Sequence, residues 1–222
     1  MYEVRVTPIE ENSSKLIGLA TVVVDGSFVF SGIKLLMTDN YSANKGRGYN
    51  VVMPSYKNSY GEYVDFFMPV TKQMYDELAY AIDQSLKSGE IVTFGQEKLP
   101  VAVRVKENTN KSNGAWAIAT VAFNKEFVCD TIQVRESKSG NLFVAYPSYK
   151  TNKINENGDP IYQNVCNPIT KDFKQELDSR ILDKMFVKKQ GVGEMTESGP
   201  SMQHLDRKNS LNNEAVGKNH IR

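Results

Sequence analysis

One tetrapeptide with binding chemistry, Pro-Ser-Tyr-Lys, occurs twice in the chain, at residues 54–57 and at residues 147–150. A lysine ammonium can pair with a phosphate group, and the face of a neighbouring tyrosine ring offers a surface on which a nucleic-acid base stacks. The two side chains together at one exposed turn suit a site for single strands or one with little sequence specificity. The nucleic-acid-binding candidates in these two loops are Tyr56, Lys57, Tyr149 and Lys150.

The same tetrapeptides also have a purely structural interpretation. Pro54 and Pro147 can each end a strand, because proline has no backbone N–H to offer a sheet. The tyrosines would then pack beside the core, and the lysines would be ordinary solvated charges. The repetition of all four residues fits a structural turn as well as it fits a binding loop.

A second candidate site lies in the glycine-rich segment 40–49, where Lys45 and Arg47 alternate with glycines and tyrosines stand at either end. Glycines allow the backbone to approach a phosphate closely, and tyrosines add stacking surfaces. Lys45 and Arg47 therefore join the candidate nucleic-acid-binding residues. A flexible insertion with incidental charge explains the same composition.

The residue pattern shows no catalytic site. Both histidines, His204 and His220, fall near the end of the chain, and no set of Cys, His and Asp residues has metal-ligand spacing. No glycine-rich phosphate cradle follows a predicted strand. We expect a protein that is not an enzyme and that has no cofactor and no metal site.

The elements that position the candidate loops are encoded twice. Val4-Arg5-Val6 returns as Val103-Arg104-Val105, and Pro69 returns as Pro168, each at an offset of 99 residues. The tetrapeptides alone depart from this frame, because the first copy has six extra residues before them and the second has six extra after them. The period is too long for a solenoid repeat and indicates a tandem duplication of a domain of about 90 residues.

Each copy has the pattern of a small α+β domain. In the first copy, two runs rich in β-branched and aromatic residues, 16–24 and 28–36, flank Asp25-Gly26, which is typical of a tight hairpin. After Thr71, a candidate N-cap, apolar residues from Tyr75 to Leu86 recur at helical spacing. Three shorter strands are predicted at 3–6, 49–53 and 64–67, with second-copy counterparts at 102–105, 142–146 and 163–166.

The expected fold class is therefore α+β, with two similar small domains packed as an internal pseudo-dimer. Each domain is an antiparallel sheet of about five short strands with one C-terminal helix. The expected boundaries are 1–88 for copy 1, 89–99 for a linker, 100–189 for copy 2 and 190–222 for a disordered tail. Within the linker, Ile91–Phe94 is expected either to add a strand or to pack between the domains.

The order of these motifs resembles the stage V sporulation protein G (SpoVG) septation family. The resemblance rests on a strand that ends in Pro-Ser followed by a basic residue, then a Gly-acidic turn, a short strand, a Pro-Val or Pro-Ile pair and a terminal helix. It covers almost all of residues 1–187, once per copy. It implies small bacterial regulators of septation and sporulation that bind nucleic acid, usually as dimers of a single domain. The chain differs from the family pattern in three respects. It has Tyr-Lys in place of two adjacent basic residues, and it has Met68 and Asn167 in place of a histidine before the Pro-Val or Pro-Ile pair. In copy 2, Asn164 replaces the aspartate that copy 1 keeps at Asp65.

Composition restricts the partners and the compartment. The chain carries 27 basic and 26 acidic residues, so any nucleic-acid binding must come from local patches. Cys129 and Cys166 align with Phe30 and Phe67 of the other copy, which favours small buried apolar side chains, with a disulfide between them as the alternative. There is no apolar run of membrane-spanning length, so we expect a soluble, cytoplasmic protein with no membrane partner.

Two classes of function remain. The first is a bacterial nucleic-acid-binding regulator linked to septation, sporulation or gene expression, which binds DNA or RNA weakly to moderately through the basic and aromatic loops and is monomeric with an internal pseudo-two-fold axis. The alternative is a non-catalytic protein-interaction scaffold built from the duplicated sheets. Basic loops on one shared face would favour the first, and an exposed apolar sheet edge would favour the second.

Overall fold

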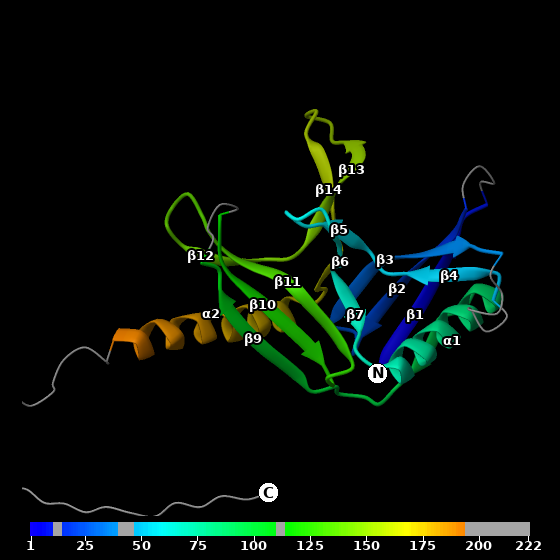
Figure 1. The fold of residues 1–222 in the computed structure, drawn as a ribbon, viewed down its shortest axis with the longest axis horizontal. Coiled ribbons are helices and arrows are strands. Elements are labelled where there is room, and N and C mark those ends of the chain that lie inside the picture. The colour runs from blue at the N-terminus through cyan, green and yellow to red at the C-terminus, as the bar shows by residue number, and fades with distance from the viewer. Residues whose placement is uncertain (11–14, 40–46, 110–113, 194–222) are drawn as a thin grey trace, which may run out of the picture.

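The computed structural model describes residues 1–10, 15–39, 47–109 and 114–193 (Figure 1). Lys45 and most of the expected C-terminal tail, residues 194–222, lie outside the described residues. In the described ranges, no helix is long and apolar enough to cross a membrane.

Copy 1 forms an antiparallel sheet whose central strands are joined by the predicted hairpin. Its own strands are β1 (Tyr2–Pro8), β2 (Leu16–Val24), β3 (Phe28–Met37) and β4 (Tyr49–Val52). Asp25 and Gly26 both have positive φ, at 46° and 60°, as a tight turn between twisted strands requires. The linker adds an edge strand, β8 (Val92–Phe94), which pairs with β1 and confirms the first of the two expectations for this segment.

Copy 2 repeats this arrangement. Its sheet contains β9 (Val101–Glu107), β10 (Ala115–Phe123), β11 (Phe127–Glu136) and β12 (Leu142–Ala145). Each copy ends in a helix that packs on its own sheet, α1 (Lys72–Ser88) and α2 (Lys171–Gly193). Thr71 caps α1 by accepting a hydrogen bond from the backbone N–H of Met74 at 3.1 Å. Helix α2 runs past residue 189, so the first residues of the expected tail are helical.

The two copies exchange a strand. β7 (Phe67–Pro69) of copy 1 pairs with β11 of copy 2, and β15 (Cys166–Pro168) of copy 2 pairs with β3 of copy 1. The prediction that segments 64–67 and 163–166 complete the sheets of their own copies was wrong. The local pattern indicates an extended segment, but it carries no information about which sheet edge that segment joins.

A shared aromatic core lies where the strands cross. The rings of Phe30 and Phe127, one from each copy, have centroids 4.5 Å apart, and those of Phe28 and Phe123 are 5.0 Å apart. All four side chains are buried. The chain is therefore an internal pseudo-dimer whose halves share one core, as the sequence predicts.

The two cysteines meet in this core. Cys129 on β11 and Cys166 on β15 are buried free thiols with Sγ atoms 2.6 Å apart. They occupy the place that Phe30 and Phe67 take on the other side of the pseudo-two-fold axis, where those ring centroids lie 4.9 Å apart. Their alignment with phenylalanines correctly indicated that they are buried.

The outer edges of the two sheets are protected differently. In copy 1, β8 covers the edge of β1. In copy 2, the guanidinium of Arg180 donates to the carbonyl oxygen of Val101 at 2.6 Å, and the ammonium of Lys184 donates to that of Val103 at 2.7 Å. These two cations thus use backbone acceptors on the edge strand β9 that would otherwise be open to another strand.

Candidate nucleic-acid interface

The Ser-Tyr-Lys part of each tetrapeptide lies in a strand and is not a loop. β5 (Ser55–Lys57) pairs with β6 (Tyr63–Asp65), and β13 (Ser148–Ile154) pairs with β14 (Pro160–Asn164). Each pair forms a two-stranded hairpin separate from the main sheets, and Figure 1 shows the β13–β14 hairpin projecting away from them. The expectation of exposed turns at these positions was therefore wrong.

This geometry separates the tyrosine of each tetrapeptide from its lysine. Successive side chains of a strand point to opposite faces, so Tyr56 and Lys57 cannot contact the same group on one face of β5. The same holds for Tyr149 and Lys150 on β13. The combined lysine and tyrosine site expected at one turn does not form from adjacent residues.

Each lysine instead has a tyrosine directly opposite it on the neighbouring strand. Lys57 pairs in register with Tyr63, and Lys150 with Tyr162. Directly opposed residues share a face, with Cβ atoms about 4.5–5.5 Å apart. Tyr63 is 76% exposed and Tyr162 is 61% exposed, so both rings are open to solvent. Sequence analysis missed both tyrosines. Counting back across the glycine turn would have placed Tyr63 opposite Lys57, whereas Tyr162 faces Lys150 only because the register shifts between Lys150 and Ile154.

The turns at the tips of the two hairpins are alike. Asn58 Oδ1 accepts hydrogen bonds from the backbone N–H groups of Tyr60 and Glu62 at 2.9 and 3.0 Å, and Asn155 Oδ1 accepts two equivalent bonds. Gly61 follows with φ of 84°, a value that favours glycine. The asparagine turn thus fixes the pair of Lys57 and Tyr63 in copy 1, whereas in copy 2 a register shift between Lys150 and Ile154 also contributes to the pair of Lys150 and Tyr162.

The tetrapeptide tyrosines are only partly exposed. The ring of Tyr56 lies 4.9 Å from that of Phe66, and burial together with the nearby negative charge of Asp130 raises the pKa of Tyr56. The hydroxyl of Tyr149 lies 3.0 Å from Gln163 Oε1, to which it donates. These contacts fit the structural interpretation of the tyrosines, while leaving part of each ring accessible.

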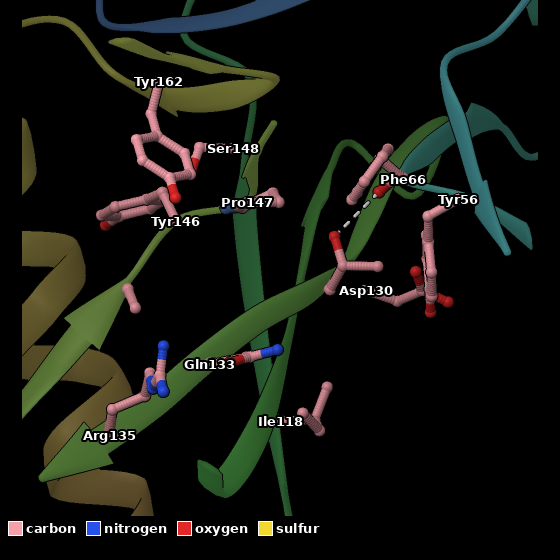
Figure 2. A pocket seen from close by; sticks show the side chains of 12 residues that line it. Tyr56, Phe66, Ile118, Asp130, Gln133, Arg135, Tyr146, Pro147, Ser148 and Tyr162 are labelled. Carbon is pink, nitrogen blue, oxygen red and sulfur yellow. Dashed lines mark hydrogen bonds between the residues drawn. The ribbon is translucent and has the colours of Figure 1, made fainter. Parts of the chain in front are cut away.

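A hollow of about 590 Å³ lies between the copy 1 hairpin and the sheet of copy 2 (Figure 2). Thr131 on β11 donates a hydrogen bond to the carbonyl oxygen of Phe66 at 3.3 Å, which holds the end of the hairpin against that sheet. Burial raises the pKa of the Asp130 carboxyl on the wall of the hollow. The lining includes Tyr56, Phe66, Asp130, Arg135, Tyr146 and Tyr162.

Arg47 is not part of this region. It precedes β4, whereas the copy 1 tetrapeptide follows that strand, so the length of β4 separates them. The Nε atom of Arg47 is buried without a hydrogen-bond partner. Its neighbour Tyr49 donates to Asp83 on α1 at 3.2 Å. Burial and the charge of Asp83 raise the pKa of Tyr49, and the positive charge of Arg47 partly opposes this.

Metal coordination has no support in the described part of the chain, where no three His, Cys, Asp or Glu side chains are grouped to hold an ion. The arrangement offers cations, aromatic faces and a hollow, which are means of binding a ligand.

Comparison with known proteins places these features in a family. The family model described as SpoVG matches the chain twice, over residues 1–88 and 100–186. A relative named "Putative septation protein SpoVG" from Thermoanaerobacter sp. (strain X514) is 36% identical over 80 residues, which cover 36% of this chain and 78% of the relative. A protein of the same name from Clostridium novyi (strain NT) is 37% identical over 73 residues, covering 33% of this chain and 66% of the relative. The chain belongs to the SpoVG family and carries two tandem copies of its domain.

Proposed function

We propose that the protein is a bacterial nucleic-acid-binding regulator linked to septation, sporulation or gene expression, and that it acts without catalysis or a cofactor. The observation that carries the proposal is the pair of exposed lysine and tyrosine side chains on one face of each hairpin, Lys57 with Tyr63 and Lys150 with Tyr162. The link to septation rests on the names of the relatives.

Each pair combines the two interactions that a single strand offers. The ammonium can neutralise a backbone phosphate, and the ring can stack on the adjacent base. Because every base has a flat face, such a site binds with little sequence preference. The pseudo-two-fold arrangement supplies two such hairpins in one chain.

The charges around the pairs limit the affinity. Glu62 and Asp65 lie on the same hairpin as Lys57, and Glu156 and Asp159 on the same hairpin as Lys150. Few phosphates are therefore neutralised, and we expect weak binding with a shallow dependence on salt. We also expect a monomer, because the strand exchange that would join two single-domain chains is satisfied within this one.

Fluorescence anisotropy with single-stranded DNA, duplex DNA and RNA at several salt concentrations tests the proposal. Replacing Lys57 and Lys150 by alanine should weaken binding to every sequence and flatten the log–log salt slope by about 1.4, at about 0.7 per phosphate on a single strand. Replacing Tyr63 and Tyr162 by alanine should cost about 1–3 kcal/mol per stacked base and leave the slope unchanged.

Matched controls remove the same groups elsewhere. Lys87 and Lys106 are exposed on α1 and β9, and Tyr80 is exposed on α1. Changing them to alanine should alter neither the affinity nor the slope beyond the small effect of net charge. If the hairpin variants bind like the parent, or if no nucleic acid binds, the proposal is wrong and a role in binding protein partners becomes the better account.

A further inference from the structure

The hollow beside the hairpins has diverged from its counterpart across the pseudo-two-fold axis. Both sides keep the proline and serine of the tetrapeptide and an exposed tyrosine, Tyr162 or Tyr63. The polar groups differ, because copy 2 has a carboxylate and a guanidinium where copy 1 has a hydroxyl and an aliphatic side chain. The equivalent residues are Asp130, Gln133, Arg135 and Tyr146 on one side, and Ser31, Lys34, Leu36 and Met53 on the other.

The walls of the hollow include aromatic rings from both copies. Figure 2 shows Tyr56, from β5, and Tyr162, from β14, on different sides of the space. Its volume of about 590 Å³ falls in the range of about 300–1,000 Å³ that is usual for small-molecule sites. Flat aromatic walls around a space of this size suit a planar, unstacked base.

Asp130 determines which ligand groups can enter. Its carboxyl lies on the wall of the hollow, and an ionised carboxylate has about four acceptor sites and no donor. A phosphate placed beside it would be repelled, so the carboxylate needs a neutral ligand edge that donates. Arg135 lies five residues farther along β11 and also lines the hollow, where a phosphate of the same nucleic-acid strand can be accommodated.

Among the bases, guanine fits this requirement best. Its Watson–Crick edge presents two adjacent donors, the N1–H and the exocyclic N2 amine, which match the two oxygens of a carboxylate. Adenine and cytosine each present one amine next to an acceptor nitrogen, and thymine or uracil presents one N–H between two carbonyls. An acceptor facing Asp130 would be repelled by its carboxylate.

We propose that the hollow binds one unstacked guanine of a single-stranded nucleic acid, with Asp130 accepting hydrogen bonds from N1–H and N2 and with the rings of Tyr56 and Tyr162 beside the base. This proposal rests on the proposed function and gives one of the two sides of the pseudo-dimer a base preference that the other side lacks.

The test uses the full chain and a fluorescent oligothymidine with one central position varied. Deoxyguanosine at that position should bind at least about fivefold more tightly than deoxyinosine, which lacks only the N2 amine, and more tightly than deoxyadenosine. Asp130→Asn should abolish this preference without weakening binding to plain oligothymidine, because it removes the acceptor pair together with a charge that repels phosphate.

The matched control is Ser31→Asn, which introduces the same side chain at the equivalent position of the other copy and should keep the guanine preference. Equal binding of the guanosine and inosine probes by the parent, or a preference that survives in Asp130→Asn, overturns this inference while leaving nucleic-acid binding intact. Failure to bind any probe overturns the inference and the proposed function together.

Discussion

Replacing Phe30 by alanine should destabilise both copies at once. The ring belongs to copy 1 and is fully buried, at 0% exposure. Its centroid lies 4.5 Å from that of Phe127 and 5.7 Å from that of Phe123, both in copy 2, and 4.9 Å from that of Phe67 on the exchanged strand. Truncating such a ring leaves a cavity that the crossing strands cannot easily fill, and Phe→Ala changes in cores cost about 3–5 kcal/mol.

For a protein of this size, each kcal/mol lowers Tm by about 2–4 °C, so Phe30→Ala should lower it by about 6–20 °C. Differential scanning calorimetry should show one transition in the parent and one in the variant, since the two sheets share a core. Tyr80→Ala, at an exposed position on α1, serves as the control and should leave Tm almost unchanged. Two separate peaks, of which only one moves, would refute the conclusion that the copies form a single core.

Three further outcomes are expected. Burial would raise the pKa of Asp25, but the N-terminal ammonium and backbone N–H groups of the linker lower it overall. The ionised Asp25 carboxylate therefore stabilises the fold at neutral pH, and this contribution is lost as the pH falls below about 4. Denaturant midpoints of Asp25→Asn should accordingly lie below those of the parent at neutral pH and approach them in acid. Hydrogen peroxide should oxidise the thiols of Cys129 and Cys166 to a disulfide, and the two thiol hydrogens leave as water. Intact-mass spectrometry should detect the loss of two hydrogens from the chain and their return on treatment with a reductant. Changing Arg180 and Lys184 to alanine should leave carbonyl groups of the β9 edge unpaired, so that this edge can pair with another chain. Light scattering should then detect self-association of the variant. A variant that stays monomeric would contradict the protective role of these two residues.

Local signals in the sequence accounted for most of the elements. The Asp25-Gly26 turn, the Thr71 cap and the apolar stripe of α1 each depend on residues close in sequence, so their structure could be predicted. The strand exchange could not, because Phe67–Pro69 is three residues long and its apolar pattern suits either sheet edge. The meeting of Cys129 with Cys166 follows from that exchange, and the sequence offered their proximity only as the alternative of a disulfide, whereas the two thiols are free.

The candidate site was predicted in part. The tetrapeptides led to the right hairpins, but adjacency in sequence was taken for adjacency in space. In a strand the relevant neighbour is the residue opposite, and Tyr63 and Tyr162 become visible only when the register of each hairpin is known. The hollow at Asp130 needs a third element, because it forms where a copy 1 hairpin lies on a copy 2 sheet.

Photochemical cross-linking tests the central claim, that single-stranded nucleic acid binds at the two hairpins, most directly. The full chain would be irradiated with an oligonucleotide that carries photoreactive uracils, digested, and analysed by mass spectrometry for peptides joined to nucleotides. We predict cross-links within residues 55–65 and 148–164, with Tyr63 and Tyr162 the principal sites. Binding with cross-links confined to α1, α2 or the outer edges of the sheets would contradict the account.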